Sequence, residues 1–521
     1  MKLLTSFLSR LKVEQVFRLK FLAFVIPFCW YVLVDFVFNP MWSTNDGHQL
    51  AVLTHELGTA SPLWDMQTIL FSLFSKHYLP ALLVMSLVSA LSLFNFIRVY
   101  LKFSNSSTKE RWAFSIIVFY SLLPVYWTFN ASFFPSTNYL PLGLFLLSFL
   151  FEIYHIRAAF FSQFHKVVLL ALVLFWISET RRDAMYAEYL MALIFALVFF
   201  LSKRYRTNQG VYSEIIVDEL TNHHGGKATL VVPTGATTNV RGGFNVKRRI
   251  LFGKILLIVL VLSFSFSFAQ VRSVLGVPVA DPAGADWVST GVSVPIMIDA
   301  KAILDSPNLE YISYDDNKWF EDHGFNLECL KGFRPNISDP IKGCYVLAMT
   351  KYQASQQEFL RRSLNVAFYH PEHTMTTYLT FIRPLIDPTY ELFGLQNWVA
   401  AGWKDVDVWM RDLDVNANCN KICQMFDFAA RATFRVPILS VLISAGGVQI
   451  FAFIVCLFVG IRKKKYAPLL FFTPLMCSYA VLAVSAPVQL PVYSYLGIVM
   501  APLAVILFRE EVRQKPSSDV E

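Results

Sequence analysis

The sequence predicts an all-α polytopic membrane protein with about ten transmembrane helices and a mixed extracytoplasmic domain. Of its 521 residues, 55% are apolar and only 16% are charged, against about 25% charged in soluble domains. The mean hydropathy is +0.47. The net charge of +8 does not indicate a nucleic-acid partner, because the basic residues lie in short loops beside apolar runs. A soluble protein is therefore excluded.

The predicted spans are apolar runs of about 17–25 residues, which is the length that a helix needs to cross a bilayer. The N-terminal stretch is basic and weakly amphipathic and lacks the compact apolar core and cleavage site of a signal peptide. We therefore expect the first run to be retained as a helix. The predicted spans are 20–38, 79–101, 112–129, 133–154, 166–180, 184–202, 250–270, 436–460, 466–484 and 489–508.

The loops between these spans sort their charge as the positive-inside rule requires when the N-terminus is cytoplasmic. Basic clusters then fall in the inner loops 102–111, 155–165, 203–249 and 461–465. The outer segment 271–435 carries 20 Asp plus Glu against 15 Lys plus Arg, a net of −5, so the remainder carries +13. Both termini are then expected to be cytoplasmic.

Three domains follow from this arrangement. They are an N-terminal membrane domain 1–270 with seven spans, the outer loop 39–78 and the cytoplasmic loop 203–249; a periplasmic domain 271–435; and a C-terminal membrane domain 436–521 with three spans and the tail.

Within the periplasmic domain, residues 274–300 hold proline, glycine and β-branched residues, so we expect loops and short strands there. Helices are expected from about residue 352 onward. Trp398, Trp403 and Trp409 fit either the membrane interface or the core of this domain.

The cysteines divide by location. Cys29, Cys456 and Cys477 lie in predicted spans and act as small apolar residues. An even number of cysteines in the oxidising outer segment indicates two disulfides, and the spacing does not match a zinc site. These cysteines are Cys329, Cys344, Cys419 and Cys423, with Cys329–Cys344 and Cys419–Cys423 as the local pairing.

An acidic residue follows the first span. Asp46 shares a helical face with Gln49 and Glu56, opposite an apolar face, so this loop is expected to lie as a helix on the outer membrane surface. A carboxylate there can act as general base toward a sugar hydroxyl or can bind a divalent metal; the alternative is a solvated residue at a helix start. His48 and His55 are two turns apart and cannot chelate one ion alone. No metal site is therefore assigned.

Arg181 and Arg182 stand between two spans, at a boundary that the charge rule places outside the cytoplasm. Guanidinium groups bind phosphate oxygens bidentately, so this pair predicts a lipid-phosphate substrate. The alternative is a structural ion pair with Asp183 or another carboxylate. Gln489 and Tyr493, at the outer end of the last span, are expected to contact a sugar or a lipid headgroup.

Three short motifs follow one another along the chain. They are Val294-Pro295-Ile296, Ser338-Asp339-Pro340-Ile341-Lys342, and Tyr369-His370-Pro371 followed by Tyr378-Leu379. Together with the features above, these motifs resemble the GT-C class of polytopic membrane glycosyltransferases, whose bacterial members carry similar motifs in the same order. Two positions depart from the pattern: Met297-Ile298 replace a glutamine pair, and Pro135-Ser136-Thr137-Asn138 replace a Lys-Asp pair.

The resemblance implies a GT-C-like fold and transfer of a sugar from a polyprenyl-phosphate carrier to a surface glycan such as O-antigen. Asp46 is then the base, Arg181 and Arg182 bind the carrier phosphate, and His370 and Tyr378 contact substrate. The implied location is the bacterial cytoplasmic (inner) membrane. The implied partners are the lipid-linked donor, the glycan acceptor and the bilayer, with no nucleic acid. No cofactor is assigned, and the sequence leaves open whether a divalent cation is needed. The alternatives are a polysaccharide polymerase, a lipid-linked glycan flippase or a non-catalytic assembly protein. The spans hold almost no interior charge, which argues against transport.

Overall fold

The computed structural model of the chain is helical wherever it has regular structure. Of the described residues, 87% are helical and none forms a strand. The all-α class expected from the sequence is confirmed for this part of the chain. The described residues are 2–38, 78–130, 139–180, 190, 251, 254–257, 293–306, 308–335, 339–386, 420–436, 446–485 and 491–513.

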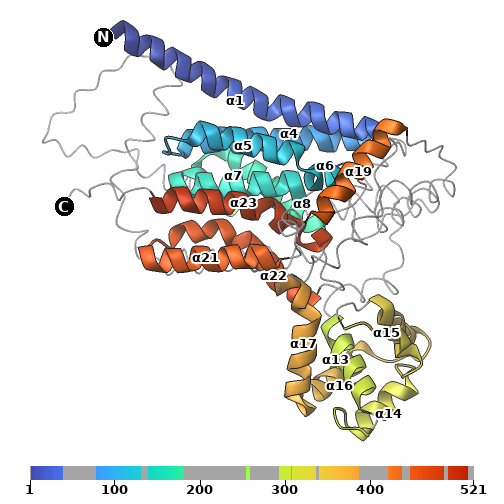
Figure 1. The fold of residues 1–521 in the computed structure, drawn as a ribbon. Coiled ribbons are helices and arrows are strands. Elements are labelled where there is room, and N and C mark those ends of the chain that lie inside the picture. Colours follow the sequence, from blue (N-terminus) through green and yellow to red (C-terminus); the bar gives the residue numbers. More distant parts are fainter. Residues whose placement is uncertain are drawn as a thin grey trace, which may run out of the picture.

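The larger group of helices forms a bundle around one hydrophobic core (Figure 1). Its members are α1 (Lys2–Val37), α4 (Tyr78–Phe103), α5 (Lys109–Leu122), α6 (Pro124–Asn130), α7 (Tyr139–Ile156), α8 (Phe164–Thr180), α21 (Gly447–Lys463), α22 (Thr473–Ser485) and α23 (Pro491–Arg513), with the 3₁₀ helices η2 (Arg157–Ser162) and η8 (Ala467–Phe472). The long helices run side by side, and the N-terminus of α1 lies at the same end of the bundle as the C-terminus of α23.

A separate helix, α19 (Lys421–Arg435), lies across the other end of the bundle (Figure 1). Phe426 of this helix packs on the bundle, with its ring centroid 5.7 Å from that of Trp30 and 5.8 Å from that of Trp127. The sequence assigns α19 to the predicted outer segment 271–435, and in the structure it packs on the helices of the bundle.

Among the described residues, two helices are long and apolar enough to cross a membrane, Val16–Val37 and Leu79–Phe103. Large apolar side chains also face outward from the bundle, as on a surface that meets lipid; Phe17 of α1 is 69% exposed and Phe458 of α21 is 68% exposed. The expected spans 184–202 and 250–270 lie largely outside the described residues. The full set of ten spans therefore stays a prediction.

The expected span 112–129 is two helices rather than one. α5 ends at Leu122 and α6 begins at Pro124. Leu123 between them has an extended backbone, with φ −69° and ψ 122°. A proline disfavours the helical conformation of the residue before it and offers no N–H to the preceding turn. The single uninterrupted helix expected from apolar content is therefore wrong.

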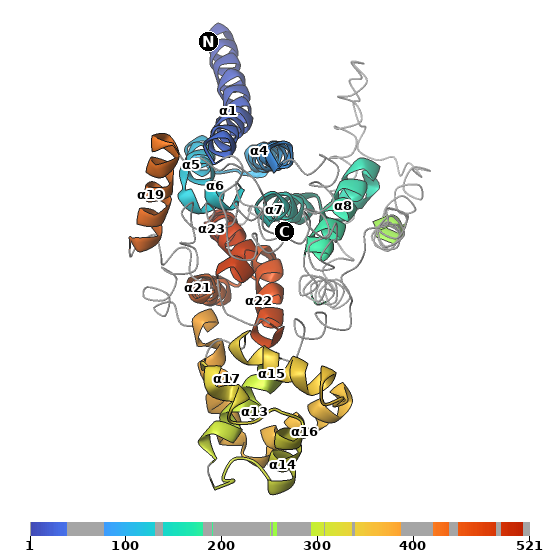
Figure 2. The same cartoon turned by 90° about the vertical axis from the view of Figure 1, so that its right-hand side faces the viewer.

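A second group of helices packs around a hydrophobic core of its own and stands beside the bundle (Figure 2). Its members are α13 (Ser293–Asp305), α14 (Tyr314–Asp322), α15 (Asp339–Thr350), α16 (Gln356–Tyr369) and α17 (Pro371–Ile386), with the 3₁₀ helix η4 (Cys329–Gly332). We call this group the α13–α17 domain. α17 contacts α21 and α22 of the bundle. The helices expected from about residue 352 are present as α16 and α17.

The mixed character expected for this domain is not found in its described residues. Loops and short strands were expected over 274–300, whereas residues 293–305 form α13. Pro295 lies in the first turn, where a missing N–H costs no hydrogen bond. Ile296, Ala300 and Ile303 share one face and are buried. Burial of this helical stripe outweighs the strand preference of its β-branched residues.

Candidate functional site

Much of the predicted site lies outside the described part of the chain. Tyr493 is in the first turn of α23, but its side chain is not among those described. His370 and Tyr378 are described. The residues outside the described ranges are Asp46, Gln49, Glu56, Arg181, Arg182, Cys419 and Gln489. The bundle nevertheless defines the end from which the chain enters these segments.

One end of the bundle, here called the Glu510 end, joins α4, α7 and α23. The Tyr100 hydroxyl donates a 2.5 Å hydrogen bond to Glu510 Oε1. His155 Nε2 lies 3.2 Å from Glu511 Oε1. All four residues belong to the last turns of their helices. These three helices therefore run parallel and end together.

The opposite end is here called the Asp35 end. α1 runs antiparallel to α4, because Asp35 near the end of α1 meets Ser86 in the first turns of α4. α8 runs antiparallel to α7, because Lys166 at its start pairs with Glu152 near the end of α7. α1 and α8 therefore finish at the same end, where the chain continues into the first predicted outer loop and into the arginine pair.

A buried polar group, here called the Asp35 cluster, consists of Asp35, Ser86, Ser89 and Asn130. Asp35 is fully buried, and its Oδ2 accepts a 2.6 Å hydrogen bond from the Ser86 hydroxyl. Ser86 Oγ accepts in turn from Asn130 Nδ2 at 2.7 Å, and Ser89 Oγ donates to Asn130 Oδ1 at 2.8 Å. The cluster therefore joins α1, α4 and α6 at the Asp35 end.

Asp35 has an oxygen that the described residues leave unused. Its Oδ1 is buried and has no hydrogen-bond partner among them, and no described cation lies within the 4.0 Å of an ion pair. A buried carboxylate without compensation is costly, so an ionisable residue at membrane depth is a functional candidate. Asp35 lies two residues before the end of the apolar stretch Val16–Val37, about 3 Å along the axis. It is therefore at the boundary of the apolar stretch and not at its middle.

Asp35 is not among the site residues predicted from the sequence. It lies inside the predicted span 20–38, three residues before its end. The available signal is a lone acidic residue in an apolar run, with Ser86 and Ser89 one helical turn apart in another. Only the fold brings these two runs together.

Tyrosine hydroxyls hold the helices together near the cluster. Tyr31 donates to the Tyr120 carbonyl at 2.5 Å, and that carbonyl belongs to the last turn of α5, which has no helical donor left. Tyr126 donates to the Ile498 carbonyl at 3.2 Å. Pro502 lies four residues later in α23 and supplies no N–H to this carbonyl. Each tyrosine hydroxyl thus donates to a backbone carbonyl of another helix that accepts no hydrogen bond within that helix.

His370 and Tyr378 belong to the α13–α17 domain and not to the Asp35 cluster. The His370 ring lies edge-on to Tyr311, with centroids 5.0 Å apart, and Tyr311 stacks on His373 at 4.2 Å. His373 Nε2 lies 3.1 Å from Asp305 Oδ2. His370 Nδ1 is buried without a partner among the described residues. Tyr378 packs half-buried against the domain core, and this burial raises its pKa.

The domain contains a second buried carboxylate with an unused oxygen. Asp299 of α13 is fully buried and accepts a 2.5 Å hydrogen bond from the Ser363 hydroxyl of α16. Its Oδ1 has no partner within the described ranges. Burial raises the pKa of Asp299 well above its ordinary value, and the hydrogen bond from Ser363 opposes that rise.

An ion-pair network on the domain surface joins α14 to α16. Arg361 and Arg362 both bind Glu358, at 2.5 Å and 2.9 Å from Oε1. Hydrogen bonds from the two arginines lower the pKa of Glu358 to about 2. Arg362 also lies 2.7 Å from Asp316 of α14. All oxygens of Glu358 are therefore used, since Arg361 Nε binds Oε2 at 2.8 Å.

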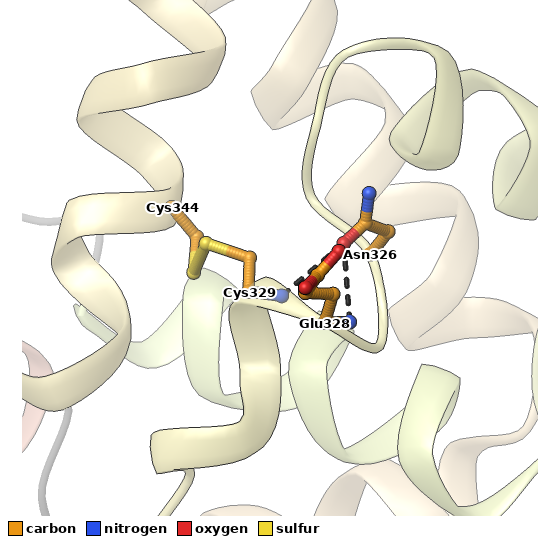
Figure 3. The surroundings of a disulfide bond; sticks show 4 residues. All are labelled: Asn326, Glu328, Cys329 and Cys344. Atoms are coloured by element: carbon orange, nitrogen blue, oxygen red, sulfur yellow. Dashed lines mark hydrogen bonds between the residues drawn. A yellow bond between two sulfur atoms is a disulfide. The ribbon is translucent and has the colours of Figure 1, made fainter.

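A disulfide joins Cys329 of η4 to Cys344 of α15, with the two Cα atoms 5.8 Å apart (Figure 3). This is the local pairing expected from the sequence. Asn326 accepts hydrogen bonds from the backbone N–H groups of Glu328 and Cys329, at 3.1 Å and 3.2 Å, and so shapes the turn that presents Cys329. Closing a 15-residue loop stabilises a domain by about 3 kcal/mol. Cys423 is also disulfide-bonded.

Comparisons with known proteins return no match. No protein-family model, no curated protein and no solved structure matches the chain. An assignment of function therefore depends on the residues and geometry of the chain itself.

Proposed function

We propose that the chain is a multi-pass membrane glycosyltransferase of the GT-C type. It moves a sugar from a polyprenyl-phosphate carrier to a surface glycan at the Asp35 end of the bundle. It lies in the bacterial cytoplasmic membrane with both termini inside. The observation that carries the proposal is the Asp35 cluster, a buried carboxylate with an unused oxygen at the end where the chain enters the predicted site segments.

Redox chemistry and charge support this orientation. The disulfide Cys329–Cys344 is typical of the oxidising side of the membrane. The Glu510 end carries exposed Arg111, Arg509 and Arg513, as the positive-inside rule requires of a cytoplasmic face. The Asp35 end then faces the periplasm.

The proposed reaction is a single displacement at the anomeric carbon. The acceptor hydroxyl oxygen attacks this carbon and passes its proton to the Asp46 carboxylate. The bond from the anomeric carbon to the carrier oxygen breaks, and the electron pair leaves with the carrier phosphate. Arg181 and Arg182 hold that phosphate with charge-assisted hydrogen bonds. The configuration at the anomeric carbon is inverted.

Asp35 acts as a positioning residue in this proposal. It anchors the end of α1, eleven residues before Asp46, and Asn130 anchors the end of α6 through the same hydrogen-bond network. A general base must lie within hydrogen-bond reach of the proton that it removes. A fixed end of α1 narrows the range of positions open to the loop that carries Asp46.

A lipid-linked glycan flippase is the second candidate, and Asp35 itself favours it. Intramembrane carboxylates are typical of transport pathways. The place of Asp35, two residues from the end of its apolar stretch, fits a reaction at the headgroup level better than a midplane binding site. A polysaccharide polymerase differs from a transferase in its product, a ladder of repeats instead of one added sugar.

The test is a transfer assay with the purified full chain in detergent micelles, polyprenyl-phosphate hexoses as donors and a lipid-linked glycan as acceptor. Chemistry proceeds in micelles, whereas transport needs two compartments. Asp46→Asn removes the charge and keeps the shape, so we expect transfer to fall by about a hundredfold or more. Asp322→Asn, an exposed acid in α14, is the matched control and keeps the wild-type rate.

Each outcome separates the candidates. Transfer by the wild type and loss in Asp46→Asn support the transferase. Equal rates in both proteins contradict the role of Asp46. Absence of product in micelles, with movement of the donor lipid across vesicle membranes, replaces the transferase with the flippase. The same comparison in a deletion strain of the source bacterium shows whether a sugar branch of the surface glycan is lost.

A further inference from the structure

The Glu510 end of the bundle contains a cavity of about 670 Å³. It lies between the loop that joins α4 to α5 and the last turns of α23, at the end opposite the proposed transferase site. Its lining is rich in arginine and in hydroxyl groups. The lining residues are Asn105, Ser106, Ser107, Thr108, Arg111, Trp112, Ser115, Ile506, Arg509, Glu510 and Arg513.

Three guanidinium groups line this cavity without a carboxylate to neutralise them. Arg111, Arg509 and Arg513 are exposed. Within the described ranges none of them makes an ion pair with an acidic side chain. Like charges that converge on one space repel each other unless an anion lies between them. The cavity therefore favours an anionic occupant.

The single acidic residue in the lining, Glu510, does not neutralise the three arginines. Glu510 is buried, and both of its oxygens are already bonded. Tyr100 donates to Oε1 at 2.5 Å and Ser104 donates to Oε2 at 2.6 Å. With three cationic residues and one acidic residue in its lining, the cavity has a net charge of +2.

Arg509 and two of the lining hydroxyls are oriented by neighbouring groups. Arg509 lies over the Trp112 ring, with Cζ 5.5 Å from the centroid, and stacking of this kind orients the guanidinium plane. Ser106 Oγ lies 3.0 Å from Thr108 Oγ1. Lys109 donates to two carbonyls of the end of α4 and the loop, both at 3.1 Å. The loop is thus tied to the helix before it.

The cavity opens beside apolar surface. Ile506 is part of its lining, and Phe114, one turn beyond Arg111 on α5, is 49% exposed. A phospholipid has this arrangement of chemistry, with a charged phosphate next to hydrocarbon. α5 also begins at the cavity, and the positive end of its helix dipole adds to the attraction for an anion.

We propose that this cavity binds a phosphate group, with Arg111, Arg509 and Arg513 as its ligands. The group is carried either by the headgroup of an anionic lipid or by a soluble phosphate ester. Guanidinium groups suit both, because they match phosphate oxygens in a planar, bidentate geometry. The proposal does not depend on the transferase activity, since it concerns the other end of the bundle.

The test is native mass spectrometry of the purified full chain with phosphatidylglycerol, phosphatidylcholine or glycerol phosphate as the added probe. The double variant Arg111→Gln, Arg513→Gln removes two charges from the cavity. The matched control is Arg462→Gln, Lys463→Gln, which removes two exposed charges from the end of α21, outside the cavity. We expect phosphatidylglycerol binding to fall about tenfold in the cavity variant and to stay unchanged in the control.

The three probes distinguish the sources of phosphate. If the cavity variant loses only phosphatidylglycerol binding, the phosphate belongs to a lipid headgroup. If it loses only glycerol phosphate binding, the phosphate belongs to a soluble ester. Equal binding of both anions by the wild type and the cavity variant overturns the proposal. An equal loss in the control variant overturns it too, because the effect is then one of overall charge. The unfolding temperatures of all variants are compared first. Arg509→Lys provides a second cavity variant, which keeps the charge but loses the planar guanidinium group.

Discussion

Asp35 and Glu510 are buried carboxylates at opposite ends of one bundle, and they differ in how their oxygens are used. Glu510 accepts one hydroxyl on each oxygen, from Tyr100 and from Ser104. Asp35 accepts one hydroxyl, from Ser86, and its second oxygen has no partner among the described residues. A fully bonded buried carboxylate is a structural connection between helices, whereas an incompletely bonded one retains an unmet demand for a partner.

The same contrast recurs in the α13–α17 domain. Asp299 is buried, and one of its oxygens has no partner among the described residues. Both oxygens of Glu358, in contrast, accept hydrogen bonds from arginines. The two pairs of carboxylates, one in the bundle and one in the α13–α17 domain, therefore show the same difference. Carboxylates with complete hydrogen bonding stabilise the fold, and carboxylates with an unused oxygen reduce stability or serve function.

The largest expected effect is on activity, at the Asp35 end. Asp35→Asn keeps the volume and an acceptor for Ser86 but removes the ionisable carboxyl group, so we expect the transfer rate to fall by about ten- to a hundredfold, as for a disturbed positioning residue. Glu510→Gln should leave the rate within about twofold. Steady-state rates across pH in the micelle assay measure both. Equal effects of the two substitutions would erase the functional difference between the ends.

The next effect is on stability, at the Glu510 end. Glu510→Ala leaves the hydroxyls of Tyr100 and Ser104 without an acceptor, and we expect a loss of about 1–3 kcal/mol in the free energy of unfolding. Asp35→Ala frees only the Ser86 hydroxyl and should cost less. Thermal unfolding of the full chain in detergent measures the difference. A larger loss at Asp35 than at Glu510 contradicts the structural assignment of Glu510.

The next effect, at Asp299, depends on pH. The raised pKa of Asp299 means that the folded state holds the proton more tightly than the unfolded state, whose pKa is about 3.9. Its stabilising contribution is therefore present below that value and is lost as pH rises toward the folded pKa, by up to about 1.4 kcal/mol per pH unit.

Asp299→Asn does not titrate, so this pH dependence should disappear in the variant. Hydrogen exchange of peptides from 293–306 and 356–369, corrected for the intrinsic rate at each pH, measures the domain separately from the bundle. Asp322→Asn is the exposed control and should follow the wild type. An unchanged slope in Asp299→Asn would mean that another group causes it.

The smallest effect is expected at Glu358, with the opposite sign. Its pKa of about 2 lies below the unfolded value of about 4.3, so its contribution is present above about pH 4.3 and is lost as pH falls toward 2. Glu358→Gln should therefore weaken the domain at neutral pH and flatten the acid limb of the same hydrogen-exchange experiment. Exposed pairs contribute little. An effect larger than that of Asp299→Asn would contradict the comparison.

The sequence predicted the fold class and the broad position of several helices, because apolar runs and loop charges are local signals. The helices after residue 352 and the pairing of Cys329 with Cys344 were also within its reach, since both depend on neighbours in the chain. The break at Leu123 was visible in principle through Pro124, but apolar content outweighed it in the prediction. Residues 293–305 were expected as loop and strand because β-branched residues favour strands. The burial of one helical face, which decides for a helix, depends on packing partners that are far away in the sequence.

The sequence by itself determined where the apolar segments lie, how charge is distributed among the segments between them and which cysteines share the segment 271–435, because each follows from residue type and short spacing. Only the tertiary structure decided which carboxylates have partners. Asp35 meets Ser86 across 51 positions of the chain, and Glu510 meets Tyr100 across 410. Hydrogen bonds over such separations have no local signature, so the difference between a satisfied and an unsatisfied carboxylate exists only once the helices are packed together.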